Sequence, residues 1–275
     1  MLLSLIKKYL FKIIRKLEKY PEFILFILNN ISYFKFLLPH DKDYYGMKLI
    51  FKKKNLNSFL DIGANTGTST LGFLKMGFCN KIYLFEPNFF LFERYLKKIK
   101  KNHANIDIYN LALGSKNSKL NFYMPFIDNV FIHYFSSFSK SYVKNSCLKT
   151  FPNKKISIKR KIINVKKFDD LGIVSKIDFI KIDTEGHDLE VIKGMKKTIK
   201  KFKPVLLIEF NKNIFQRTIN ILQDYSQYFY NLEKNSLIKI KNSNMYNLDR
   251  FGHKNSLSSR NIYFIHKSKR KMILC

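Results

Sequence analysis

Cysteine is scarce in this sequence, and its three cysteines, Cys79, Cys147 and Cys275, lie far apart without any CxxC pair. Disulfide frameworks and zinc sites need paired or closely spaced thiols, so the sequence indicates neither of them. This cysteine usage fits a reducing compartment best. We therefore expect a cytoplasmic protein.

Long apolar runs are also missing. The longest early run, Phe23 to Leu28, is far shorter than the roughly 18 residues of a membrane-spanning helix. Near the N-terminus, basic residues between Lys7 and Lys16 interrupt the stretch that would be apolar in a secretory signal. These absences predict a protein that is soluble or attached only to a membrane surface.

Acidic residues are few, because 51 Lys and Arg face only 20 Asp and Glu, which gives a formal net charge of +31. Such an excess attracts polyanions whatever their sequence. The lysines are spread along the whole chain, however, as a biased composition would also produce. Charge alone therefore identifies neither a nucleic acid nor a membrane as the partner. The apolar share of 46%, with 27 Phe and 16 Tyr, is sufficient for a packed interior.

Residues 1–44 are predicted to form a helical extension ahead of a domain at 45–275. Within residues 2–19, an apolar stripe at helical spacing lies beside lysines and an arginine, which is typical of a basic amphipathic helix. Through residues 1–20 this helix could attach to an anionic membrane, or it could pack on the domain or on a second subunit. A second helix is expected from Phe23 to Leu38, between two prolines. The oligomeric state stays open.

From about Phe59, short apolar strands alternate with helical stretches, as in a doubly wound α/β sheet of the Rossmann-like kind. The pattern predicts strands at 57–61, 81–86, 106–110, 177–183 and 204–210, and helices at 67–77, 88–101, 167–175 and 187–201. Strands at 228–232, 237–241 and 262–266 suit an antiparallel C-terminal part. Residues 115–165 are longer than an ordinary connection, so we expect an insertion with local strands and a substrate-facing loop.

The first chemical motif runs from Asp61 to Gly67, where an apolar strand enters a glycine turn and then a helix. Gly63 and Gly67 let the backbone approach a ligand without a Cβ, and Asn65 tolerates left-handed geometry. A dinucleotide loop has the pattern GxGxxG around a pyrophosphate. Here the middle glycine is missing and Asp61 ends the strand. An acid there repels a pyrophosphate but suits the positively charged amino group of a methionine moiety.

The second motif is Glu86-Pro87, which closes the apolar run Ile82 to Phe85. It follows Gly67 by nineteen residues, about the spacing at which a Rossmann-type sheet places an acid on the ribose hydroxyls. We therefore expect Glu86, together with Pro87, to hold a ribose.

The third motif begins at a buried strand that ends in Asp183. It delivers Asp183, Glu185 and His187 to the carboxyl end of the sheet, where ligands bind in open α/β folds. These groups could deprotonate a hydroxyl or bind a divalent cation. We take His187 as the preferred base, with Asp183 or Glu185 orienting it or holding a metal.

Together the motifs resemble the FkbM-type methyltransferase family, with its DxGANxG loop, its EP pair and its KID-x-EG segment, here Lys181 to Gly186. The Ala-Leu-Gly at 112–114 and the Ile-Glu at 208–209 match as well, so that the resemblance covers roughly residues 45–266. It implies a class I methyltransferase sheet, mostly parallel with an antiparallel C-terminal strand, and S-adenosylmethionine as methyl donor. The cofactor-binding residues that it implies are Asp61, Gly63, Ala64, Asn65, Gly67, Glu86 and Pro87, with Asn110 and Ala112 near the adenine.

Several members of that family methylate sugar or polyketide hydroxyls. The resemblance thus implies O-methylation of a sugar in a glycan, lipopolysaccharide or glycolipid precursor. An NAD-dependent sugar-nucleotide dehydrogenase or epimerase is the alternative, but the YxxxK-like pair Tyr44 and Lys48 precedes the glycine loop instead of following it. An RNA methyltransferase would agree with the charge. No two prolines are adjacent and no Pro-Cys pair occurs, which disfavours a nucleic-acid substrate.

Overall fold

The computed structural model describes residues 42–51, 56–75, 79–173, 175–231, 234–240 and 261–272. The helices predicted at 2–19 and 23–38, and the membrane role considered for residues 1–20, lie outside this part of the chain. Among the described residues, no helix is long and apolar enough to cross a membrane.

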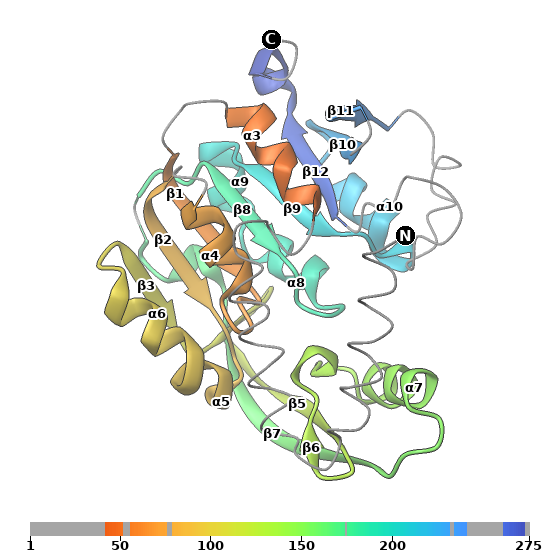
Figure 1. Ribbon diagram of the computed structural model, residues 1–275. Helices are drawn as coiled ribbons and strands as arrows, with labels where there is room; N and C mark the ends of the chain where they lie inside the picture. The colour runs from red at the N-terminus through yellow and green to blue at the C-terminus, as the bar shows by residue number, and fades with distance from the viewer. Residues whose placement is uncertain are drawn as a thin grey trace, which may run out of the picture.

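An eight-stranded sheet with the order β11-β10-β12-β9-β8-β1-β2-β3 forms the centre of the domain (Figure 1). Strands β3, β2, β1, β8 and β9 run parallel, whereas β12 is antiparallel to both of its neighbours. The expected doubly wound sheet with an antiparallel C-terminal strand is therefore confirmed. Its strands are β1 (Leu56–Ile62), β2 (Cys79–Phe85), β3 (Ile106–Tyr109), β8 (Phe179–Ile182), β9 (Val205–Glu209), β10 (Tyr225–Asn231), β11 (Ser236–Lys239) and β12 (Asn261–His266).

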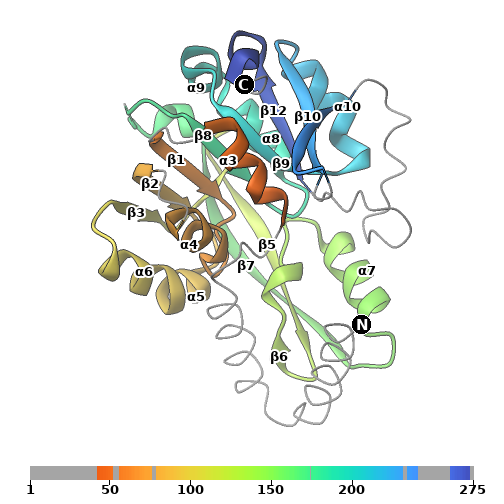
Figure 2. The same cartoon turned by 45° about the horizontal axis from the view of Figure 1, so that its top comes forward.

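Helices cover both faces of the sheet (Figures 1 and 2). The helices are α3 (Gly46–Phe51), α4 (Thr68–Lys75), α5 (Phe89–Leu91), α6 (Lys97–Asn102), α7 (Lys140–Thr150), α8 (Asp188–Lys193), α9 (Lys196–Phe202) and α10 (Lys212–Ile221). A π-helical turn, Phe92–Leu96, joins α5 to α6, so that the helix predicted at 88–101 is present as one helical stretch. Short 3-10 turns occupy Lys42–Tyr45, His133–Phe135, Phe168–Asp170 and Lys267–Met272.

Burial on both faces explains why the central strands are nearly continuous apolar runs. Alternate residues of one strand enter different cores, because successive side chains point to opposite faces. Phe179 of β8 packs in the core that contains Phe73 of α4, whereas Ile180 packs in the core that contains Val191 of α8. Tyr44 is fully buried in the Phe179 core, so packing of the domain extends N-terminal of residue 45.

Strand register places the three sequence motifs at one edge of the sheet. Ile62, the last residue of β1, pairs with Phe85 of β2 and with Ile182 of β8. The residues that follow these strands are Gly63, Glu86 and Asp183. Because parallel strands end at the same edge, these three residues face a common space.

Residues 115–166 build a second sheet, which we call the arm and which projects beyond this carboxyl edge (Figures 1 and 2). Its strand order is β4-β7-β5-β6, and β5 pairs antiparallel with β7 along its whole length. The local strands expected within residues 115–165 are therefore present. The strands are β4 (Ala112–Leu113, just before the arm), β5 (Ser118–Ile127), β6 (Val130–Phe131) and β7 (Ile156–Lys166).

One helix prediction is wrong, and another misses a break. The helix expected at 167–175 is only the 3-10 turn Phe168–Asp170, because Gly172 has a left-handed φ of 68° that a helix cannot contain. The helix expected at 187–201 is broken between α8 and α9 at Gly194. The backbone of Gly194 passes so close to Gly114 that a Cβ would lie 1.9 Å from the Gly114 carbonyl oxygen.

Gly194→Ala should therefore destabilise the fold. The added methyl group would force α8 away from Gly114, at a cost of about 1 to 3 kcal/mol in the free energy of unfolding. Urea denaturation measures this loss. Lys200→Ala, at an exposed position on α9, is the matched control and should change the value by no more than about 0.5 kcal/mol. Equal stability of the two variants would contradict the close approach.

Candidate active site

A cleft opens at the carboxyl edge of β1, β2 and β8. The arm closes its other side with Phe122, His133, Ser136 and Phe138. All three predicted catalytic residues and most of the predicted cofactor-binding residues line this cleft. They are Gly63, Asn65, Glu86, Pro87, Ala112, Asp183, Glu185 and His187.

Four of the predicted cofactor-binding residues, Asp61, Ala64, Gly67 and Asn110, are not among the residues that line the cleft. The Asn110 side-chain amide donates to the backbone oxygens of Glu86 at 2.9 Å and of Pro87 at 3.2 Å. It thereby fixes the segment that carries the strand-end acid. Direct contact of these four residues with a cofactor stays a prediction.

The glycine loop has the backbone geometry that its sequence predicts. Asn65 has a φ of 53° and Gly63 a φ of 79°, both in the left-handed region. A Cβ on Gly63 would lie 1.9 Å from the backbone oxygen of Asp183. Glycine is needed at this position because the loop after β1 touches the end of β8.

Glu86 connects the glycine loop to the start of α5. Its carboxylate accepts backbone N–H groups from Asn65 and from Asn88, each at 2.8 Å. Burial raises the pKa of Glu86 to about 7, although these two hydrogen bonds act in the opposite direction. A carboxylate has further lone pairs, and Glu86 lines the cleft, so it can still accept hydroxyl groups from a ligand.

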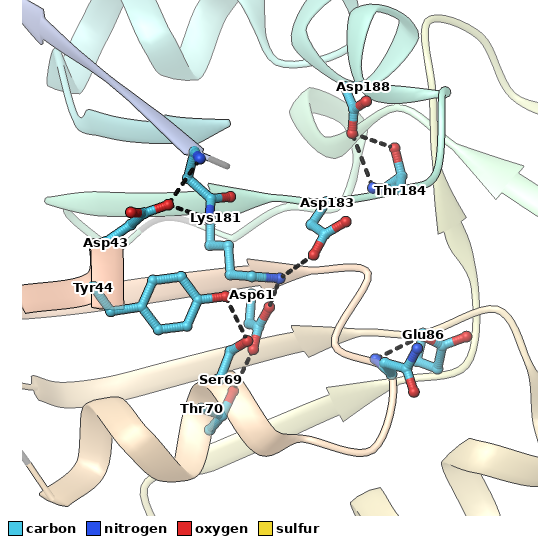
Figure 3. A network of polar contacts seen from close by, with 12 residues as sticks. Asp43, Tyr44, Asp61, Ser69, Thr70, Glu86, Lys181, Asp183, Thr184 and Asp188 are labelled. Atoms are coloured by element: carbon cyan, nitrogen blue, oxygen red, sulfur yellow. Dashed lines mark hydrogen bonds and ion pairs between the residues drawn. The ribbon is translucent and has the colours of Figure 1, made fainter. Parts of the chain in front are cut away.

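Lys181 is buried beneath the cleft between two carboxylates (Figure 3). Its Nζ lies 3.4 Å from Asp61 Oδ1 and 3.3 Å from Asp183 Oδ2. The Thr70 hydroxyl donates to the other Asp61 oxygen at 2.7 Å. Burial favours the neutral amine, but Asp183 and Asp61 outweigh it and raise the pKa of Lys181 well above its ordinary value. The Asp61 carboxylate is thus committed to a buried ion pair.

The turn after Asp183 is held by Asp188. One oxygen of its buried carboxylate accepts the backbone N–H of Thr184 at 2.9 Å and the Thr184 hydroxyl at 2.8 Å (Figure 3). Glu185 and Gly186 have φ values of 50° and 96°, a conformation that needs such support. This turn presents Glu185 and His187 to the cleft.

Two histidines line the arm side of the cleft. Burial lowers the pKa of His133 to about 4, and it also lowers the pKa of His187 against the opposing Glu190 carboxylate. Both imidazoles are therefore neutral at pH 7. The His187 ring packs against Phe138, with ring centroids 4.7 Å apart. Glu185 accepts a hydrogen bond from the Tyr142 hydroxyl, which comes from α7 of the arm.

Unpartnered polar atoms are concentrated in this cleft. Seven buried side-chain nitrogen or oxygen atoms of the described residues have no hydrogen-bond partner. Five of the seven belong to residues that line the cleft: Asn65 Oδ1, Asn88 Nδ2, His133 Nδ1, Ser136 Oγ and His187 Nε2. An unmade hydrogen bond at a buried group costs about 1 to 3 kcal/mol. Their convergence indicates that a polar ligand completes the site.

Asp183, Glu185 and Glu209 form the one acidic group in the described part of the chain that could hold a metal ion. One ligand oxygen from each lies within 4.8 Å of the others. Carboxylate oxygens suit a hard divalent cation such as Mg²⁺. Asp183 and Glu185 also have partners in Lys181 and Tyr142. Activity measured with and without a chelator would test whether the protein uses a metal at this position.

Several residues of the site were missed in the sequence. Lys181 carried a usable signal, because a lysine inside an apolar strand must find a carboxylate when it is buried. His133, Ser136 and Phe138 carried none, because the pairing of β5 with β7 brings them to the cleft.

The sheet, with its reversed strand β12 and a ligand cleft at the carboxyl edge of its parallel strands, is that of a class I methyltransferase. The chain belongs to the family described as Methyltransferase FkbM domain, which matches residues 61–233, more than half of its length. The resemblance inferred from the three motifs is thereby confirmed. No curated protein matches the sequence.

Among solved structures, a methyltransferase FkbM from Methylobacillus flagellatus KT is similar, with 17% identity and a TM-score of 0.49 over 81% of this chain and 48% of that chain. A precorrin-6y C5,15-methyltransferase from Geobacter metallireducens GS-15 has 12% identity and a TM-score of 0.39, covering 83% and 88%. A putative RNA methyltransferase from Pyrococcus horikoshii has 7% identity and a TM-score of 0.38, covering 82% of each chain. The chain spans about half the length of the first of these proteins.

Lys181→Met should be strongly destabilising. It would leave the buried Asp61 and the half-buried Asp183 without their cation, at an expected cost of about 3 to 5 kcal/mol in the free energy of unfolding. Lys176→Met removes a lysine that is 61% exposed and pairs with Asp178, so it should cost at most about 1 kcal/mol. Denaturation of both variants at pH 7 tests the difference, and similar losses would show that the buried pair has no special weight.

Glu86 should make stability depend on pH. Because its folded-state pKa of about 7 is raised above the unfolded value, its contribution is fully present below the unfolded pKa and is lost as pH rises through 7. Glu86→Gln removes this titration. The free energy of unfolding of the variant, relative to the unmodified chain, should rise by about 3 kcal/mol between pH 4.5 and pH 8. A difference that stays constant with pH would contradict the raised pKa.

Proposed function

We propose that this protein transfers a methyl group from S-adenosylmethionine to a hydroxyl oxygen on a sugar of a glycan, lipopolysaccharide or glycolipid precursor. The observation that carries the proposal is the convergence of five unpartnered polar atoms on one cleft, beside a strand-end acid. Asn65 and Asn88 lie beside Glu86, whereas His133, Ser136 and His187 lie toward the arm. This division provides one part of the cleft for a cofactor and another for an acceptor.

The cofactor part fits S-adenosylmethionine. Glu86 would accept the ribose hydroxyls, and the unpartnered amide atoms of Asn65 and Asn88 offer further hydrogen bonds nearby. Leu111 and Ala112 give the same wall an apolar surface suited to an adenine. When bound, the cofactor supplies an electrophilic methyl group on a sulfonium centre.

His187 is the base that the geometry favours. It is neutral at pH 7, and its unpartnered Nε2 can take the proton of an acceptor hydroxyl. Phe138 packs against the ring and restricts its orientation. Because residue 114 is a glycine, no side chain crowds this nitrogen: a Cβ on Gly114 would lie 3.1 Å from Nε2. The Glu190 carboxylate contributes negative charge that stabilises a protonated His187.

A sugar acceptor suits the arm side of the cleft. His133 and Ser136 offer uncharged donors and acceptors, and Phe122 and Phe138 add apolar surface. Rings that bear several hydroxyl groups have both of these complementary features. Two alternative activities would use the same strand-end acid. An NAD-dependent sugar-nucleotide dehydrogenase or epimerase would differ by binding NAD, and an RNA methyltransferase would differ by binding RNA.

Calorimetric titration of the full chain with S-adenosylmethionine, S-adenosylhomocysteine and NAD tests the cofactor. We expect both sulfur compounds to bind and NAD to bind far more weakly. Tight NAD binding without either sulfur compound would refute the methyltransferase proposal.

His187→Ala should abolish most methyl transfer without loss of cofactor binding. Removing a general base lowers the rate constant by about 10² to 10⁴. The readout is transfer of labelled methyl to a glycan extract, with S-adenosylmethionine affinity measured in parallel. His103→Ala is the control, because this histidine lies at the end of α6 outside the cleft and should leave transfer unchanged. Undiminished transfer by His187→Ala would exclude the histidine as base.

A further inference from the structure

Two phenylalanines stand half exposed at the mouth of the cleft. Phe89 and Phe90 are 49% and 44% exposed, and they follow Asn88, which lines the cleft. Large exposed apolar side chains gathered in one place commonly mark a binding surface.

Each exposed ring has a cation over it, and so does a ring of the arm. Lys161 Nζ lies 4.9 Å from the centroid of Phe89, and the Arg94 guanidinium lies 5.4 Å from that of Phe90. On the arm, Lys159 Nζ lies 4.6 Å from the centroid of Phe126. We call these six residues, Phe89, Phe90, Phe126, Arg94, Lys159 and Lys161, the rim.

The rim continues into the cleft through neighbouring rings. Phe131 of β6 contacts both Phe90 and Phe126, with centroid distances of 5.9 and 5.3 Å. Phe131 also lies 6.3 Å from the ring of His133, which lines the cleft. The rings of Phe90, Phe131 and His133 thus form a continuous row from the rim to the cleft.

Charge differs sharply between the rim and the interior. The acids nearest to the rim in sequence, Glu93 and Asp128, are already paired with Lys97 and Lys154 at 2.8 and 3.1 Å. The three rim cations have no carboxylate partner among the described residues. Inside the cleft the ionisable side chains are three acids, Glu86, Asp183 and Glu185, and two histidines that are neutral at pH 7.

From this polarity we propose that the acceptor is an anionic sugar derivative, in which the unit with the reacting hydroxyl is uncharged and an adjoining phosphate or carboxylate binds the rim cations. The inference rests on the proposed function and names its substrate class. An anion inside the cleft would meet carboxylates, whereas an anion at the rim meets unpaired cations. The aromatic rings of the rim offer apolar surface to the sugar between these two ends.

A single-stranded nucleic acid fits the rim less well. Base stacking uses free and parallel ring faces. Phe90 and Phe131 meet at 89°, and a cation covers one face of each of the three rim rings. An anionic bilayer also fits less well, because the rim borders the cleft and is formed partly by the inner face of the arm. Binding of a nucleic acid or of an anionic bilayer to the rim is therefore measured in the test as well.

The test compares calorimetric affinities of the full chain for methyl glucoside, glucose 1-phosphate and glucuronic acid. We expect at least one of the two anions to bind about fivefold tighter than the neutral sugar at low salt, with a smaller advantage at high salt. The variant Lys159→Gln/Lys161→Gln should lose most of this advantage and keep its affinity for methyl glucoside. The larger gain in affinity over methyl glucoside, for glucose 1-phosphate or for glucuronic acid, shows whether the rim prefers a phosphate or a carboxylate.

Lys119→Gln/Lys144→Gln is the control, since it removes the same charge at exposed positions outside the rim. It should retain the preference for anions. Equal affinity for all three sugars, no binding up to on the order of 10 mM, or equal losses in both variants would overturn the proposal. The proposal would also be overturned if Lys159 and Lys161 mattered only for the binding of oligouridylate or of phosphatidylglycerol vesicles, and not for the binding of sugars. If anionic sugars are preferred but S-adenosylmethionine does not bind, the proposed function fails while the rim site stands.

Discussion

The carboxyl edge of the sheet depends on one buried lysine between two carboxylates. Lys181 comes from β8, Asp61 is the last residue but one of β1, and Asp183 directly follows β8. A single ammonium group therefore joins the end of β1, just before the glycine loop, to the turn that carries His187. Buried ions are tolerated only when they are paired, which forces the two strands to end in a fixed relation. The contact of Gly63 with the Asp183 backbone reinforces that relation.

This arrangement separates the acids of the site by task. Asp61 serves the framework, Glu86 holds backbone N–H groups and faces the cleft, and Glu185 faces the arm through Tyr142. The neutral histidines and the unpartnered Ser136 then form a polar but uncharged wall. Positive charge is kept outside, at the rim. The interior of the cleft and the rim therefore differ in charge.

Patterns that are local in the sequence predicted the fold well. Apolar runs such as Ile177 to Ile182 predicted strands because two-sided burial demands them, and the acids that end these runs predicted the edge that holds the site. The breaks at Gly172 and Gly194 were missed because a left-handed residue and a contact with Gly114 stop helices that the apolar pattern alone would continue.

The structure of the arm could be predicted from the sequence only in part. Its strands were expected, but their register was not, and register decides that His133 faces the cleft beside His187. Lys181 was readable in principle, since a charge within an apolar strand implies a buried partner. Which carboxylates it would join depended on the pairing of β1 with β8.

The most direct measurement of the central claim is photolabelling of the full chain with tritium-labelled S-adenosylmethionine, followed by identification of the labelled peptides. We predict label in peptides that contain residues 61–67, 86–91 or 110–114, and loss of this label when S-adenosylhomocysteine, but not NAD, is added. Label confined to other parts of the chain, or label that S-adenosylhomocysteine does not displace, would contradict a methyl-donor site at the carboxyl edge of β1 and β2.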